Sequence, residues 1–197
     1  MANEYTTLPL LKSYVGENTN TYDLFLQQCL TTASRSVESH CRRRFYADAA
    51  ATARTYRLAD RLVCDPDGDL IIVDDISSLT DLTVEKQSGS SWNAVPDYSS
   101  EPENALAISR PITYLRRPGG LWSTPMDTRI RVTAKWGWPA VPDEVVQATL
   151  LQAARLFKRK DSVGGTVGNE EFGFLRITRV DPDVQALLRP FVIQAVG

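Results

Sequence analysis

The clearest pattern of apolar positions lies in residues 142–160. Pro142 suits a first helical turn because its missing N–H is not needed there, and acidic residues follow it. One helical face carries apolar side chains at positions i, i+4, i+7 and i+11, namely Val146, Leu150, Ala153 and Phe157. That face must be covered, so these four side chains are candidate core or subunit-interface residues.

Three further stretches have helical periodicity and recognisable ends. Residues 7–16 begin at Thr7, a suitable N-cap, and stop at Gly16. Residues 21–42 carry an apolar stripe that includes both Cys29 and Cys41. Residues 182–189 form a last short helix, which Pro190 is expected to end.

Between these helices the period changes from that of a helix to that of strands. Residues 129–136 alternate strictly between apolar and polar side chains, which predicts a half-buried strand. Shorter strands are predicted at residues 55–58, 70–73, 82–85, 106–108 and 112–115. Turn-rich segments separate them, so the region reads as a small antiparallel β domain.

The predicted fold class is therefore α+β: a small helical bundle with an inserted antiparallel β-rich domain. The bundle comprises residues 1–51 and 137–197, and the insert comprises residues 52–136. Trp136 and Trp138 flank a glycine at the second boundary. A packed hinge is favoured there over a ligand-stacking site, because tryptophan beside glycine and proline is usually structural.

Composition and charge narrow the function classes. Hydrophobic residues make up 43% of the chain, no apolar run can span a bilayer, and the N-terminus lacks a secretion signal, so we expect no membrane partner. Residues 51–110 hold 5 basic and 11 acidic side chains, whereas residues 111–197 hold 12 and 8. A sequence pI near 5.5 argues against gripping nucleic acid as the main task. A nucleic-acid-binding helical module stays open as an alternative. It would use two basic clusters, the first formed by Arg42, Arg43 and Arg44 and the second by Arg155, Lys158, Arg159 and Lys160.

No pattern predicts catalysis, a cofactor or a metal site. His40 is the one histidine, and Cys29, Cys41 and Cys64 have neither metal-ligand spacing nor a disulfide framework. The acidic run at residues 65–69 resembles a calcium loop, but its glycine comes too early, and a hairpin turn is the better interpretation. We therefore expect no enzyme, with reduced thiols as in a cytosolic protein.

Two segments near the C-terminus have less regular patterns. The glycines of residues 164–173 follow a helix instead of opening one, so they predict a mobile loop and not a phosphate site. Residues 174–180 are compatible with a strand. Residues 190–197 carry no charge and favour extended structure. Burial on the core and docking on a partner both remain open for this tail, with Phe191, Val192 and Ile193 as candidate docking residues.

The order of these parts resembles the head-to-tail connector (adaptor) proteins of tailed bacteriophages. The resemblance rests on a helix ending in Arg43-Arg44-Phe45, a β-rich insert, Gly137-Trp-Pro-x-x-Pro-x-x-Val145 before a long helix, and a glycine-rich loop. It implies a structural protein of the virion neck that assembles in the host cytoplasm as a ring. In this family the ring commonly has twelve copies.

The resemblance also implies partners. The ring would lie beneath the portal protein, extend the DNA channel and provide the docking platform for the next neck or tail-completion protein. DNA would pass through without specific binding. The C-terminal region would be the place of contact with the portal.

Overall fold

The structure is a computed structural model that describes residues 3–59, 61–119, 122, 129–161, 166–167, 175–176 and 181–193. The chain divides into two compact units. The helical unit combines Met1–Arg43 with Val141–Gly197, and the β unit is the continuous segment Arg44–Ala140. The α+β class is confirmed, since the described residues hold four α-helices and a seven-stranded antiparallel sheet. The sequence predicts one domain from residues 1–51 with 137–197 and a second from residues 52–136. That these two domains fold separately stays a prediction.

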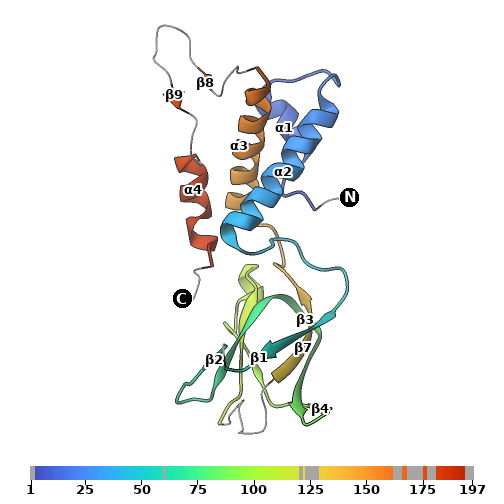
Figure 1. Ribbon diagram of the computed structural model, residues 1–197, viewed down its shortest axis with the longest axis vertical. Coiled ribbons are helices and arrows are strands. Elements are labelled where there is room, and N and C mark those ends of the chain that lie inside the picture. The colour runs from blue at the N-terminus through green and yellow to red at the C-terminus, as the bar shows by residue number, and fades with distance from the viewer. Residues whose placement is uncertain are drawn as a thin grey trace. The chain divides into compact units, whose positions relative to one another are not determined.

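All four predicted helices are present in the helical unit (Figure 1): α1 Leu8–Val15, α2 Asp23–Cys41, α3 Asp143–Lys158 and α4 Pro182–Leu188. Thr7 caps α1 by accepting a hydrogen bond from the backbone N–H of Leu10, and Gly16 ends it with φ 75°. α2 ends at Arg42, which adopts the left-handed conformation. Pro190 does not terminate the last helical segment, because a 3-10 turn, η4 Arg189–Phe191, continues through it.

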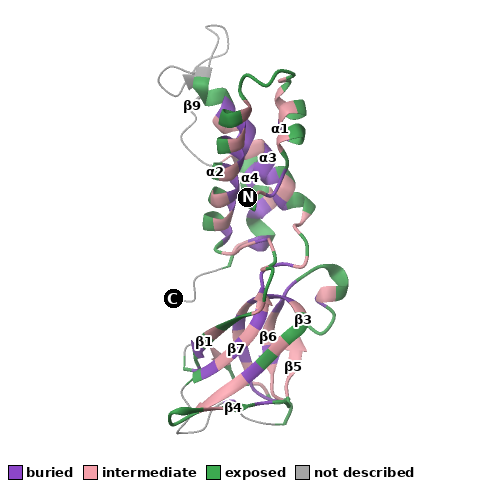
Figure 2. Cartoon of the chain, turned by 90° about the vertical axis from the view of Figure 1, so that its right-hand side faces the viewer, coloured by how far each residue is buried: buried purple, intermediate pink, exposed green. Residues whose placement is uncertain are grey.

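The core of the helical unit forms where α2, α3 and α1 pack together. Its buried side chains come from all three helices: Leu11, Leu26, Cys29, Leu30, Ala33, Leu150, Ala153, Ala154 and Phe157. Figure 2 colours these stretches of α2 and α3 as buried, whereas α1 carries exposed patches. α4 packs on α3.

The β unit contains β1 Thr52–Arg57, β2 Leu62–Val63, β3 Leu70–Ser88, β4 Ser91–Ala94, β5 Ser99–Glu101, β6 Ile112–Arg116 and β7 Arg129–Trp136. The strand order is β1-β7-β3-β6-β5, and β2 and β4 both pair with β3. The alternation predicted for residues 129–136 is confirmed, because every second residue of β7 is buried. The predicted hairpin turn is confirmed as well, since β2 and β3 pair antiparallel around residues 65–69.

Two strand predictions were wrong. Residues 70–73 and 82–85 were predicted as separate strands, but both belong to β3, whose register shifts along its length. The polar stretch between them stays in the strand because its side chains have partners; Ser77, for example, donates to the backbone oxygen of Lys135 at 2.8 Å. Residues 106–108 form a 3-10 turn, η1 Leu106–Ile108, in which Ile108 is 66% exposed. Three residues are too few for periodicity to distinguish a strand from a turn.

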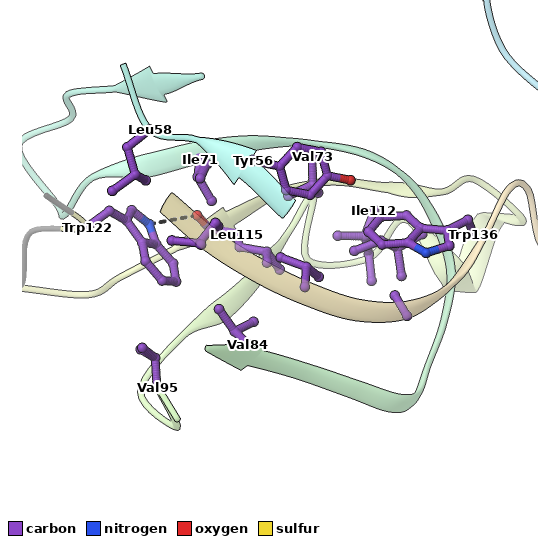
Figure 3. Packing of buried hydrophobic residues seen from close by; sticks show 14 residues of the cluster. Tyr56, Leu58, Ile71, Val73, Val84, Val95, Ile112, Leu115, Trp122 and Trp136 are labelled. Atoms are coloured by element: carbon purple, nitrogen blue, oxygen red, sulfur yellow. Dashed lines mark hydrogen bonds between the residues drawn. The ribbon is translucent and has the colours of Figure 1, made fainter. Parts of the chain in front are cut away.

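The core of the β unit lies between the strands and the Trp122 side chain (Figure 3). The indole N–H of Trp122 donates to the backbone oxygen of Leu115 at 3.1 Å, and Leu58 and Ile71 lie beside its ring. At the other end of this core Trp136 is fully buried and packs edge-on against Tyr56. Aromatic side chains thus close both ends of the core.

Two glycines allow close backbone contacts inside the β unit. Gly137 has φ 110°, and a Cβ atom there would lie 1.8 Å from the carbonyl oxygen of Tyr46. Gly68 has φ 120°, and a Cβ atom there would lie 2.1 Å from the carbonyl oxygen of Arg117. No other residue type fits these positions without moving the backbone.

Outside the β unit, β8 Thr166–Val167 and β9 Leu175–Arg176 pair antiparallel. The predicted mobile loop at residues 164–173 and the predicted strand at 174–180 otherwise lie outside the described residues.

Candidate interaction surfaces

The apolar face predicted on residues 142–160 lies mainly in the core of the helical unit. Leu150, Ala153 and Phe157 are 5%, 0% and 8% exposed, and Val146 is half-buried. Three of the four candidate residues therefore pack within one chain. A role for this face between subunits stays a prediction.

Phe157 connects the core to an aromatic surface cluster formed by Tyr22, Phe25, Phe157 and Lys160. The rings of Tyr22 and Phe25 lie 5.7 and 5.9 Å from that of Phe157, centre to centre. The Lys160 ammonium sits 3.7 Å from the centre of the Tyr22 ring, a cation–π contact. Tyr22 and Phe25 remain 38% and 37% exposed, so this cluster is a half-covered apolar surface.

Other large apolar side chains of the helical unit face water. Leu24, beside this cluster in sequence, is 86% exposed, and Leu10 and Tyr14 of α1 are 46% and 48% exposed. Leu10 and Tyr14 are spaced i, i+4 and so share one side of α1. Sequence periodicity did not single them out, because it cannot tell which apolar residues of a short amphipathic helix stay uncovered. Exposed apolar side chains of this size are typical of surfaces that bind partners.

The three candidate docking residues near the C-terminus differ from one another. Phe191 is 8% exposed, Val192 is half-buried and Ile193 is 40% exposed. The backbone N–H of Ile193 donates to the carbonyl oxygen of Cys41 at 3.1 Å, which ties this segment to the end of α2. Phe191 thus belongs to the helical unit's interior, and Ile193 presents its side chain to solvent. Residues 194–197 of the predicted tail lie outside the described residues.

The basic residues that could form a nucleic-acid surface are largely engaged within the chain. Arg44 forms an ion pair with Asp48 at 3.2 Å and lies over the Tyr46 ring. Arg155 lies 3.8 Å from Asp181, and Lys160 lies over aromatic rings. Arg43 and Arg159 also have interactions, whereas Arg42 is exposed at the end of α2. Most cations of the two clusters therefore have partners within the chain, whereas Arg42 and Lys158 are exposed.

A half-buried polar network in the β unit was missed by sequence reasoning. Asp74 accepts hydrogen bonds from Arg54 at 2.7 Å, Arg61 at 3.1 Å and the Tyr56 hydroxyl at 3.1 Å. Burial by itself would raise the pKa of Asp74, but the hydrogen bonds and charges of both arginines outweigh burial and hold that pKa below its usual range. Burial raises the pKa of Tyr56, and the Asp74 charge adds to that effect. Each guanidinium also stacks on a ring, Arg54 on Trp136 and Arg61 on Tyr56.

Trp136 and Trp138 are both structural within the β unit. The Trp136 indole N–H donates to the Thr52 carbonyl at 2.8 Å, and that of Trp138 donates to Asp75 at 3.0 Å. Trp138 is 4% exposed and packs against Phe45. Neither ring is available for stacking on a ligand.

Groups with catalytic or metal-binding chemistry are sparse. Among the described residues, no three His, Cys, Asp or Glu side chains gather as metal ligands, and no helix is long and apolar enough to cross a membrane. Asp65 of the acidic turn is instead paired with Arg116 at 2.8 Å. Cys29 and Cys41 are buried free thiols, and burial raises the pKa of Cys41 to about 11, which makes it a poor nucleophile.

Comparison with known proteins bears on the fold. No protein-family model matches the chain, and no curated protein matches it. A solved structure that it resembles is a chain from the "Neck of empty GTA particle computed with C6 symmetry", with a TM-score of 0.54 and 16% sequence identity. The match covers 100% of this chain and 98% of that chain. Both units, in the same order along the chain, thus take part in a fold shared with a protein from a particle neck.

Proposed function

We propose that this protein is a structural head-to-tail connector of a tailed bacteriophage or a related particle. It assembles into a ring of twelve copies beneath the portal, extends the DNA channel and gives the next neck or tail-completion protein its docking surface. The observation that carries this proposal is the match to a neck chain along the entire length of both proteins. A likeness confined to one unit would be weaker support, because small helical bundles and small sheets recur in many functions.

Three features of the molecule support a structural role. The neck in the matching structure was computed with C6 symmetry, with which a ring of twelve copies is compatible. The helical unit exposes Leu10, Tyr14 and Leu24, which a partner could cover. The free energy of such contacts comes from burying apolar area, so they need no cofactor or reacting group.

The charge distribution is compatible with a passage for DNA. The formal net charge is -2, and the predicted basic clusters are engaged in contacts within the chain. A wall with many free cations would bind phosphates tightly and hold the DNA in place. A nearly neutral wall lets the duplex slide.

The proposal is tested by mixing the purified protein with the portal protein of the same particle and measuring the mass of the product by native mass spectrometry. We expect a complex of one portal with twelve copies of this chain. A variant with Leu24→Ser should assemble less well, and a variant with Leu79→Ser, at an exposed leucine of the β unit, serves as the matched control.

A protein that stays monomeric and never joins the portal would contradict the proposal. Salt-dependent binding of free duplex DNA at physiological ionic strength, without portal binding, would instead favour a nucleic-acid-binding module.

A further inference from the structure

The outer face of the β1–β7 strand pair carries three arginines, Arg57, Arg129 and Arg131, here called the arginine face. Along β7 the apolar residues point into the core, so Arg129 and Arg131 point away from it. Arg57 of β1 lies directly opposite Arg129 in the antiparallel register. All three guanidinium groups therefore share one side of the sheet.

Arg57 and Arg129 are in an unfavourable arrangement as long as the chain is alone. Side chains directly opposite on neighbouring strands have Cβ atoms roughly 5 Å apart, and like charges placed so destabilise the pair. Both residues are exposed, and neither has an ion-pair partner in the part of the chain that the structure describes. Arg131 differs, because Glu85 holds it through two hydrogen bonds of 2.6 and 2.8 Å and Trp92 lies under it. Among the described residues, no carboxylate neutralises Arg57 or Arg129.

Complementary charge lies on the turn between β2 and β3 and in and beside β5, on residues here called the acidic edge: Asp65, Asp67, Asp97, Glu101 and Glu103. Two arginines join part of it, since Arg116 bridges Asp65 and Glu101 while Arg117 pairs with Asp97. Five carboxylates meet only two guanidinium groups, which leaves a net charge of about -3. Asp67 and Glu103 are exposed and, among the described residues, have no ion-pair partner.

The arginine face lies on β1 and β7, whereas the acidic edge lies on the β2–β3 turn and around β5, so the two surfaces are different. A contact between two different surfaces of identical chains is heterologous, and repeating it around an axis closes a ring. We propose that the arginine face of one copy binds the acidic edge of the next copy. This inference rests on the proposed ring.

Duplex DNA is a less suitable occupant of the arginine face. Phosphates could pair with Arg57 and Arg129, but they would leave Asp67 and Glu103 without cations. A second copy satisfies both surfaces at once. Complementary charges of this kind set the register of an interface and exclude wrong pairings.

The test uses two charge-reversal variants of the full chain, each mixed with the portal. Variant one carries Arg57→Glu with Arg129→Glu, and variant two carries Asp67→Lys with Glu103→Lys. Each variant places like charges on both sides of every contact, so the protein concentration needed for ring assembly should rise about tenfold or more. Lys158→Glu, at an exposed lysine of the helical unit, lies outside both surfaces and should assemble as the unsubstituted protein does.

Mixing the two variants in equal amounts provides the decisive readout. Copies of variant one and variant two alternating around a ring restore opposite charges at every contact, so assembly should return. Circular-dichroism melting of each variant alone confirms that it is folded. Misfolded variants would not rescue one another.

Four outcomes are possible. Loss of assembly in each variant and rescue by mixing support the contact. Normal assembly of either variant, or loss without rescue, overturns the contact and leaves the connector function standing. If variant one forms rings normally but loses salt-dependent DNA binding, the arginine face is a phosphate-binding surface. That result also overturns the proposed contact. An unsubstituted protein that fails to join the portal removes the proposed function itself, and with it the inference.

Discussion

The helical unit and the β unit satisfy their buried polar groups in different ways. In the helical unit Ser34 and Thr149 are fully buried, and each hydroxyl donates to the backbone carbonyl four residues earlier in its own helix. In the β unit Asp74 and Asp75 are satisfied by Arg54 and Trp138, which are distant in sequence. Both hydroxyls thus donate locally, although Ser34 also accepts from the distant backbone N–H of Tyr5 at 3.2 Å, whereas the two carboxylates of the β unit depend on long-range donors.

The two units should therefore differ in how well they tolerate substitutions. A local hydrogen bond survives as long as its helix does, whereas a long-range one depends on correct strand register. We therefore expect the β unit to be sensitive to loss of single polar or aromatic contacts, and the helical unit to be sensitive mainly to loss of apolar volume. Substitutions in the two units test this contrast.

Trp136→Ala should have the largest effect. The ring is fully buried, its N–H donates to Thr52, and Arg54 stacks on it, so the substitution removes packing, a hydrogen bond and a cation–π contact. We expect the free energy of unfolding to fall by about 5 kcal/mol. Urea denaturation followed by tryptophan fluorescence measures it. Trp92→Ala, at a half-exposed ring, is the control, and an equal loss in both variants would show that Trp136 has no special role.

Phe157→Ala is the matching substitution in the helical unit. Its ring is 8% exposed, contacts Tyr22, Phe25 and the Lys160 ammonium, and forms no hydrogen bond, so the loss should be about 3 kcal/mol. Tyr14→Ala, at a residue 48% exposed, should change the free energy of unfolding by less than about 0.5 kcal/mol. An unchanged melting curve for Phe157→Ala together with failed ring assembly would mean that this face acts between subunits.

Asp74→Asn tests the long-range network with a smaller change. The carboxylate is 38% exposed, so solvent screens its ion pairs, and we expect a loss of about 1 kcal/mol at pH 7. The pKa of Asp74 lies below its usual range in the folded state, so the folded chain binds fewer protons than the unfolded chain at mildly acidic pH.

The lowered pKa of Asp74 determines how its contribution to the free energy of unfolding depends on pH. The stabilisation by Asp74 is present above the usual pKa of an aspartate, about 3.9, and disappears as the pH falls through the lowered folded-state value. The difference in melting temperature between the unsubstituted protein and Asp74→Asn should therefore shrink below about pH 4. A constant difference down to pH 2 would show that Asp74 contributes no charge-dependent stability.

The same local and long-range contrast explains what the sequence could predict. All four helices were found to within two residues, because caps such as Thr7 and the helical period are local signals. The strand at residues 129–136 was equally clear. The continuity of β3 was missed, because Asp74 and Asp75 look like a break until Arg54 and Trp138 are known to meet them.

Surfaces were harder to predict than elements. The opposition of Arg57 and Arg129 depends on the register between β1 and β7, two strands far apart in the sequence. Leu24 gave no signal either, because its exposure depends on which neighbours α2 acquires. The candidate face on α3 was visible from its period, but the period cannot say whether a neighbouring helix or a neighbouring subunit covers it.

The smallest effect on stability is expected at Ile193, where the C-terminal segment separates into a buried part and an exposed part. Ile193→Glu places a charge on a side chain that is already 40% exposed, and its backbone hydrogen bond to Cys41 remains, so the free energy of unfolding should change by less than about 0.5 kcal/mol. Phe191→Ala, two residues earlier at a buried ring, should lower it by about 3 kcal/mol. If this segment docks on the portal, Ile193→Glu should nevertheless weaken portal binding, because the charge would have to be desolvated in an apolar contact. Isothermal titration calorimetry of each variant against the portal, next to thermal melting of the free chain, separates the two effects. Unchanged portal binding for Ile193→Glu would exclude Ile193 from the docking surface, and a large loss of stability would mean that its side chain is needed by the helical unit itself.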